Sequence, residues 1–128
     1  MREDLRELLE AAEDDLDTAR KLYELGKYRY ACFFTQQAVE KYLKAYLLYK
    51  TNRYPFTHSI IKLIKEAIKH DRDLEYLLKV KADSLEDYYT GVRYPPLIKV
   101  TREEAKEAIG IAEEVRILIL KKLSMKRS

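Results

Sequence analysis

A group of polar side chains interrupts an otherwise apolar stretch between residues 28 and 49. Gln37, Glu40, Lys41 and Lys44 follow one another at steps of three, one and three, so they share one face of a helix. Because polar groups on a largely buried helix need partners, this set forms either a buried network or the wall of a binding site. In a site, Lys41 and Lys44 would hold phosphate, while Gln37 and Glu40 would orient the set. The structural alternative is a Glu40–Lys44 ion pair, with Lys41 reaching solvent.

A second group lies in the segment from Tyr88 to Pro96. Arg93 follows an expected helix end, and its forked guanidinium donors suit a phosphate group. Tyr89 and Tyr94 are candidates for stacking on a base, and Gly91 permits a close backbone approach. The structural alternative is that Arg93 caps the carbonyls of the preceding helix while the tyrosines fill the end of the bundle.

The two histidines differ in their surroundings. His58 follows Thr57, the expected cap of a helix, and could act as a general acid or base near neutral pH or simply hydrogen-bond a neighbouring loop. His70 lies among charged residues, where we expect it to be solvated. Cys32 is expected to be inert core. The sequence contains no zinc-finger spacing, P-loop or hydrolase triad, so we expect no metal and no cofactor.

The periodicity of apolar residues predicts the elements that carry these groups. Residues 3–25 form one amphipathic stripe that Gly26 ends, whereas residues 27–49 are apolar on nearly all sides, which is typical of a central helix. Residues 50–56 read as a loop, and Thr57 would cap a helix carrying Ile60 to Ile68. A fourth helix spans Leu74 to Tyr89. Short links between such helices predict an all-α, up-and-down antiparallel bundle of four to five helices.

The last helix has the clearest start signal. Thr101 and Glu104 form a capping box, with Val100 and Ala105 placed as a hydrophobic staple. The helix then runs to about Leu120 and is expected to fray in a basic tail, residues 121–128.

Composition limits the class of protein. The 128 residues predict a single domain, 1–128, with a core of about 3–122. A single cysteine and a highly charged first segment indicate a cytoplasmic protein that is neither secreted nor membrane-spanning. The net charge of +3 hides an acidic segment 1–25 and a basic segment 26–72, the surface we expect to face an anionic partner unless the two fields cancel. Abundant Lys and Glu with few amides is a composition seen in thermophiles.

Taken together, three motifs resemble the HEPN (higher eukaryotes and prokaryotes nucleotide-binding) domain family. They are Gln36-Gln37-Ala-x-Glu40-Lys41-x-x-Lys44-Ala45, Thr57-His58 at a helix start, and Tyr89-x-x-x-Arg93-Tyr94-Pro95. The resemblance implies a helical bundle, a homodimer and a minimal nucleotidyltransferase as partner in a prokaryotic toxin–antitoxin pair. It also implies metal-independent ribonuclease activity, for which many members use an arginine followed four to six residues later by a histidine.

The ribonuclease motif is incomplete in this chain. Arg93 matches the family arginine, but no histidine lies among residues 94–100, and the correctly spaced Arg53 and His58 belong to the loop after the second helix. We therefore expect a protein that binds a nucleotide or RNA through Gln37, Glu40, Lys41, Lys44, Tyr89, Arg93 and Tyr94, with catalysis less expected than binding. Two alternatives are a non-enzymatic interaction module for a nucleotidyltransferase, and a ribonuclease that uses Arg53 or Arg93 with His58, the latter supplied across the dimer.

Overall fold

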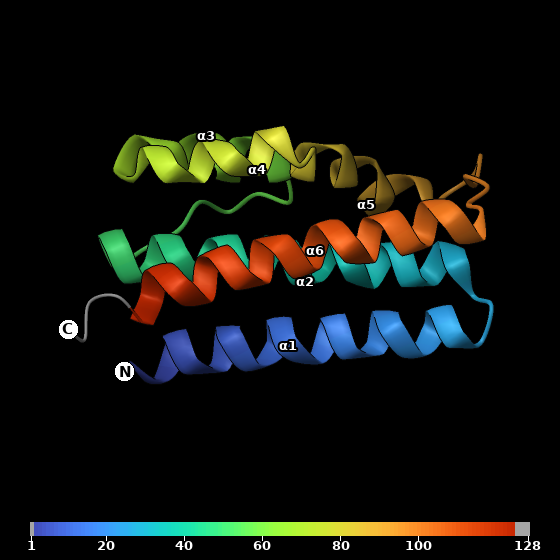
Figure 1. Ribbon diagram of the computed structural model, residues 1–128, viewed down its shortest axis with the longest axis horizontal. Helices are drawn as coiled ribbons and strands as arrows, with labels where there is room; N and C mark the ends of the chain where they lie inside the picture. Colours follow the sequence, from blue (N-terminus) through green and yellow to red (C-terminus); the bar gives the residue numbers. More distant parts are fainter. Residues whose placement is uncertain (1, 125–128) are drawn as a thin grey trace.

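The computed structural model describes residues 2–124, and within this range the regular structure is entirely helical (Figure 1). Three long helices, α1 (Glu3–Glu24), α2 (Tyr28–Thr51) and α6 (Arg102–Ser124), run side by side, and α3 (Ile60–His70) lies over α2. Between α3 and α6 the chain forms the short turns η1 (Arg72–Glu75), α4 (Tyr76–Lys79), η2 (Ala82–Asp87) and α5 (Tyr88–Gly91). The predicted all-α bundle is confirmed.

Helices α1 and α2 form an antiparallel hairpin, visible in Figure 1 as the blue and cyan ribbons. Gly26 adopts a positive φ of 77°, and the following Lys27 donates its backbone N–H to the Leu22 carbonyl at 2.9 Å. This is the αL turn that ends many helices and that glycine adopts without a Cβ clash. The apolar stripe predicted for α1 is buried against α2.

Helix α2 is the centre of the bundle. It contacts α1, α3, α5 and α6, and its buried residues lie on all sides, including the fully buried rings of Tyr42 and Tyr46. The nearly all-round apolar character of this segment is therefore largely satisfied within one chain, although Tyr30 near its start is 47 % exposed. The polar side chains that remain on α2 are consequently held in place by close packing.

The prediction of one continuous fourth helix is wrong. Leu74, Leu77 and Leu85 are buried as the periodicity indicated, but the segment divides into four short turns. Lys81 lies between α4 and η2 with a left-handed φ of 63°, which stops α4 after one turn. Periodicity reports which side chains face the core, and it does not require that one helix carry them all.

Two helix starts test the predicted caps. Ser59, not Thr57, is the N-cap of α3, where its Oγ accepts the Lys62 N–H at 3.2 Å, while Thr57 Oγ1 accepts the N–H of Ser59. At α6 the capping box is confirmed, because Thr101 Oγ1 accepts the Glu104 N–H at 3.1 Å and Glu104 Oε1 accepts the Thr101 N–H at 3.0 Å.

Helix α6 ends later than predicted, since fraying was expected after residue 120. The helix continues to Ser124, and Lys122 Nζ forms an ion pair with Asp71 at 2.8 Å, so its last described turn is tied to the residue that follows α3. The rest of the predicted basic tail lies outside the described residues.

Among the helices of residues 2–124, none combines the length and apolar character needed to cross a bilayer.

Candidate nucleotide-binding site

The site begins where the loop of residues 52–59 returns along α2. Asn52 ends α2 in the left-handed region, with a φ of 65°, and the loop then brings His58 over Glu40. His58 Nδ1 lies 3.1 and 3.2 Å from the two carboxylate oxygens of Glu40. Glu40 Oε2 also pairs with Lys44 Nζ at 2.9 Å, and only 6 % of the Glu40 side chain is exposed. The carboxylate is thus held between a lysine and an imidazole.

Two glutamines complete this buried network. Gln36 is fully buried, and its Nε2 lies 3.3 Å from both Glu40 Oε1 and the backbone oxygen of His58. Gln37 Nε2 donates to Gln36 Oε1 at 2.7 Å. Gln36 therefore fixes both the carboxylate and the backbone of His58, and Gln37 acts on the set only through Gln36.

An aromatic ring joins this network to the second predicted group. The Tyr89 ring, on α5, stacks on the imidazole of His58 at 4.2 Å with an interplanar angle of 15°. On α2, the Phe33 ring also lies nearly parallel to Tyr89, at 6.3 Å and 23°. The imidazole of His58 is therefore fixed by a carboxylate at Nδ1 and by a ring against its face. Its side chain is still 55 % exposed, and Nε2 has no hydrogen-bond partner within residues 2–124.

Arg93 lies over three aromatic rings. Its Cζ is 5.1 Å from the ring centre of Tyr89, 5.3 Å from that of Tyr94 and 5.9 Å from that of Phe33. No carboxylate within the described residues pairs with its guanidinium, and its one side-chain hydrogen bond there is a long one to the Tyr94 hydroxyl, at 3.4 Å. The structure therefore contradicts the alternative in which the Arg93 side chain caps the carbonyls of the preceding helix. The guanidinium is exposed, held by rings and available to an anion.

Gly91 sets the shape of the loop that presents Arg93. The backbone N–H of Ile98 donates to the Gly91 carbonyl at 2.9 Å, and a Cβ on Gly91 would come within 2.7 Å of Ile98 Cγ2. The close approach permitted by this glycine is thus to the chain itself. The loop borders an open hollow of about 380 Å³ whose lining is mainly aromatic: Tyr30, Phe33, Phe34, Val92, Arg93 and Tyr94.

The predicted residues fall into two sets. The structure brings together Glu40, Lys44, His58, Tyr89, Arg93 and Tyr94, with Gln37 behind them. Lys41 does not join the cluster, because its Nζ pairs with Asp15 on α1. The suggested ion pair between Glu40 and Lys44 is present, but Lys41 is engaged with α1 and does not simply reach solvent.

Sequence reasoning missed two residues of the site. Phe33 and Gln36 lie seven and four residues before Glu40, so both share its face of α2. The spacing could have identified both, but Phe33 belongs to the apolar stretch of residues 27–49 and Gln36 entered only as part of the HEPN-like motif. Cys32 agrees with its predicted role, since burial raises the pKa of its thiol to about 11 and keeps it protonated at neutral pH.

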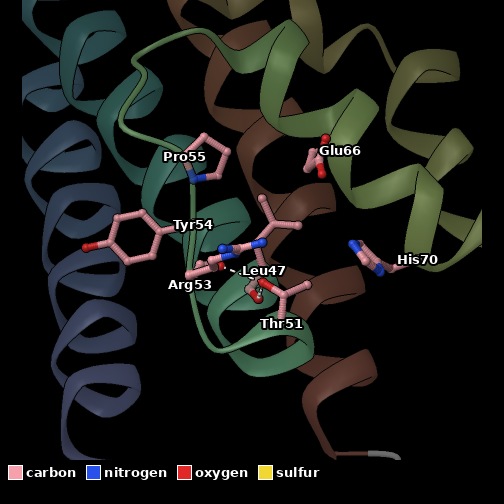
Figure 2. A pocket seen from close by; sticks show the side chains of 7 residues that line it. All are labelled: Leu47, Thr51, Arg53, Tyr54, Pro55, Glu66 and His70. Carbon is pink, nitrogen blue, oxygen red and sulfur yellow. Dashed lines mark hydrogen bonds between the residues drawn. The ribbon is translucent and has the colours of Figure 1, made fainter.

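A separate hollow of about 310 Å³ contains Arg53 and His70 (Figure 2). Arg53 is thus placed with the second histidine, whereas His58 is placed with Tyr89 and Arg93. The pairing of Arg53 with His58, which their sequence spacing allowed, has no support in this geometry. Within residues 2–124, no three His, Cys, Asp or Glu side chains lie close enough to hold a metal ion.

Comparison with known proteins finds a family model and a relative that match most of this chain. The family model of the HEPN domain matches residues 5–123. A protein of Methanocaldococcus jannaschii named "Putative toxin MJ1304" is 32 % identical over 123 residues, covering 84 % of this chain and 80 % of that protein.

Two crystal structures have similar folds. TT1696 from Thermus thermophilus superposes with a TM-score of 0.77 at 32 % identity, covering 94 % of this chain and 99 % of the other. ST0689, described as an archaeal HEPN homologue, gives a TM-score of 0.76 at 26 % identity, covering 97 % of this chain and all of the other. The bundle is therefore shared almost from end to end.

Proposed function

This chain belongs to the HEPN domain family, and from that premise we propose that it binds a nucleotide or an RNA strand at the surface formed by His58, Tyr89 and Arg93. The observation that carries the proposal is the arrangement of Arg93 and His58 on one aromatic ring, that of Tyr89. Arg93 offers a forked, unpaired donor to a phosphate, and the exposed ring of Tyr94 offers a platform to a base.

The electrostatics favour an anionic ligand. Glu40 is the carboxylate bound to His58, and its charge is already matched by Lys44. Arg93 therefore contributes a positive charge that no neighbouring acid cancels. We therefore propose that Arg93 makes the main contact to phosphate, while Lys44 positions Glu40.

Titration of a 12-nucleotide oligoadenylate tests this proposal. Arg93→Ala should lower the affinity by about tenfold or more, since a hydrogen bond to a charged group contributes about 1.5–3 kcal/mol. The affinity of the unmodified protein should fall as salt rises. Arg72→Ala is the matched control, because Arg72 is 90 % exposed, pairs with Glu75 and lines neither hollow. Equal affinities of both variants would contradict the proposal.

Metal-independent RNA cleavage is the second candidate, and the Glu40–His58 pair favours it. A carboxylate at Nδ1 fixes the tautomer of an imidazole and leaves Nε2 free to transfer a proton. His58 would then fill the role of the histidine that is missing after Arg93. In a metal-free assay, His58→Ala should reduce cleavage by about two orders of magnitude or more while RNA affinity and the circular dichroism spectrum are retained. If the unmodified protein does not cleave RNA, the cleavage proposal is wrong and binding remains as the proposed function.

We also propose that the protein is the HEPN component of a toxin–antitoxin pair, with a minimal nucleotidyltransferase as partner. The support for a toxin is the name of the archaeal relative, "Putative toxin MJ1304", and the nucleotidyltransferase is the partner that the family resemblance implies. Co-expression with a nucleotidyltransferase encoded beside this chain should give a stable complex on gel filtration. A complex that forms while RNA affinity is absent would favour the alternative, a non-enzymatic interaction module.

A further inference from the structure

The hollow at the other end of α2 holds two basic side chains that the proposed function does not use. Arg53 enters it from the loop after α2 and His70 from the last residue of α3, and Figure 2 shows the two converging on the same space. Its volume of about 310 Å³ lies within the range of small-ligand sites.

The charges of this hollow are unbalanced. Arg53 and His70 form no side-chain hydrogen bond or ion pair within residues 2–124, whereas Glu66, the acidic residue of the lining, is paired with Lys69 Nζ at 3.1 Å. Thr51 Oγ1 lies 2.7 Å from the carbonyl oxygen of Arg53 and 2.8 Å from that of Leu47. The hydroxyl therefore anchors the start of the loop, which positions Arg53. An anion is the ligand that complements the lining.

This hollow and the Arg93 site share one face of α2. Phe33, Glu40, Lys44, Leu47 and Thr51 follow one another at steps of seven, four, three and four, and over this length the helix rises about 27 Å.

The contacts between the two ends form a continuous row. Lys44 Nζ lies 5.5 Å from the ring centre of Tyr54, which lines the hollow, and it pairs with Glu40, which in turn holds His58. Beside Tyr54, the ring of Phe56 is completely exposed. Glu40 and Lys44 are almost covered, with 6 % and 11 % of their side chains exposed, so a strand along this row would contact His58 and Phe56 on the loop of residues 52–59.

We propose that the Arg53–His70 hollow is a second phosphate-binding site, and that one single-stranded RNA runs along α2 from Arg93 to Arg53. Phe56 offers a base-stacking surface along this path, and stacking on aromatic rings accepts any base. The inference rests on the proposed function, since the Arg93 site defines the other end of the strand. A length of several nucleotides fits the usual site sizes of about 4–16 nucleotides for single-strand binding.

Ligand length separates the two sites in an experiment. Adenosine 5′-monophosphate spans only one site, and we expect it at the Arg93 site, where the exposed ring of Tyr94 can stack on its base, whereas a 12-nucleotide oligoadenylate can reach both sites. Arg53→Ala and His70→Ala should each weaken binding of the oligonucleotide by about fivefold to tenfold and leave binding of the mononucleotide unchanged. Arg53→Ala should also reduce the slope of log affinity against log salt by about 0.7, the value for one contact to a single-strand phosphate. Arg72→Ala, which removes an equal charge outside the hollow, should change neither affinity.

The outcomes distinguish this inference from the proposed function. If Arg93→Ala weakens both ligands while Arg53→Ala and His70→Ala weaken neither, the second site is absent and the proposed function stands. If Arg53→Ala weakens the mononucleotide as much as the oligonucleotide, Arg53 acts at the first site and the path along α2 is wrong. If Arg93→Ala changes neither ligand, the proposed function itself fails. Circular dichroism of each variant confirms that the fold is retained.

Discussion

Tyr89 is the residue on which the candidate site depends most. Its ring contacts the imidazole of His58, the guanidinium of Arg93 and the ring of Phe33, so it links α2, the loop after α2 and the loop before α6. The sequence left two roles open for Tyr89, stacking on a base or filling the end of the bundle. In the structure its contacts are with protein side chains, and Tyr94 is the more exposed ring.

Two substitutions of Tyr89 separate its ring from its hydroxyl. Tyr89→Phe keeps the ring that supports His58 and Arg93, so oligoadenylate affinity should stay within about twofold of the unmodified protein. Tyr89→Ala removes the ring that supports His58 and Arg93, and affinity should fall by about tenfold, which corresponds to about 1.4 kcal/mol. Fluorescence anisotropy measures both. Equal losses in the two variants would assign the effect to the hydroxyl and contradict the stacking role.

Local spacing and long-range contacts differ in how far the sequence predicts them. The Glu40–Lys44 pair follows from a step of four on one helix and was foreseeable. The contact of His58 with Glu40 spans 18 residues and depends on how the chain leaves α2 at Asn52, with its left-handed φ of 65°. Asn is tolerated in that region, but nothing in the spacing shows which loop residue returns to α2. The sequence therefore predicted the members of the site better than their partners.

At the scale of the elements, the shape of the loop after α5 depends on Gly91. Gly110, in α6, provides a control substitution because it has free space around it. A Cβ on Gly91 would meet Ile98 Cγ2 at 2.7 Å, whereas a Cβ on Gly110, in the middle of α6, would meet nothing within 4 Å. Gly91→Ala should displace the loop that presents Arg93 and lower nucleotide affinity by several-fold. Gly110→Ala should keep affinity and raise the free energy of unfolding by about 0.5–1 kcal/mol, since alanine favours a helix interior. Urea denaturation and nucleotide titration of both variants test this pair, and a tighter-binding Gly91→Ala would contradict it.

The end of α6 is tied to the segment after α3 by an ion pair with a defined pH dependence. A hydrogen bond from Lys122 lowers the pKa of Asp71 below its ordinary value, outweighing the opposing effect of burial. Since the folded-state pKa is lowered, the pair stabilises the fold at neutral pH, and this contribution is lost as the pH falls below about 4 through the folded-state pKa.

Asp71→Asn tests this contribution. The variant should be less stable than the unmodified protein at about pH 6, and the difference should shrink toward about pH 3 as the native carboxylate becomes protonated. Urea denaturation at each pH measures the free energy of unfolding. Glu10→Gln, which neutralises an exposed carboxylate that forms no ion pair within residues 2–124, is a control for the same change of net charge. A difference that does not change with pH would show that the pair with Lys122 contributes nothing.

At the scale of the whole molecule, the sequence predicted the helical class and the central helix because both follow from apolar periodicity. It did not predict the division of the segment between α3 and α6, where the buried leucines recur but Lys81 stops a helical turn. Nor could it place the loop of residues 52–59, whose return along α2 creates the site (Figure 1). Both features depend on contacts between distant parts of the chain, which a local pattern does not contain.

We predict that the protein is a homodimer, as the resemblance to the HEPN family implies, and the exposed apolar side chains indicate where two copies would meet. Most apolar residues of α2 are covered within the chain, with Tyr30 at 47 % exposure as an exception, so they do not by themselves require a second copy. Large apolar side chains remain exposed elsewhere, among them Ile117 on α6 at 59 % and Tyr76 on α4 at 42 %. These two are neighbours, since the Tyr76 hydroxyl lies 3.3 Å from Glu114, one turn before Ile117. An exposed apolar surface of this kind is typical of an isologous interface.

Light scattering at micromolar concentration should therefore give twice the chain mass of 15.2 kDa. Ile117→Glu should shift the protein to the monomer, because it would place a charge at the centre of the symmetric contact without a partner. Leu25→Glu is the matched control, since Leu25 is 71 % exposed and lies at the C-terminal end of α1 rather than on α4 or α6. A dimer that survives Ile117→Glu but not Leu25→Glu would move the interface to the α1–α2 turn. A mass of 15.2 kDa at every concentration would show that the exposed side chains on α4 and α6 do not pair two copies of the chain.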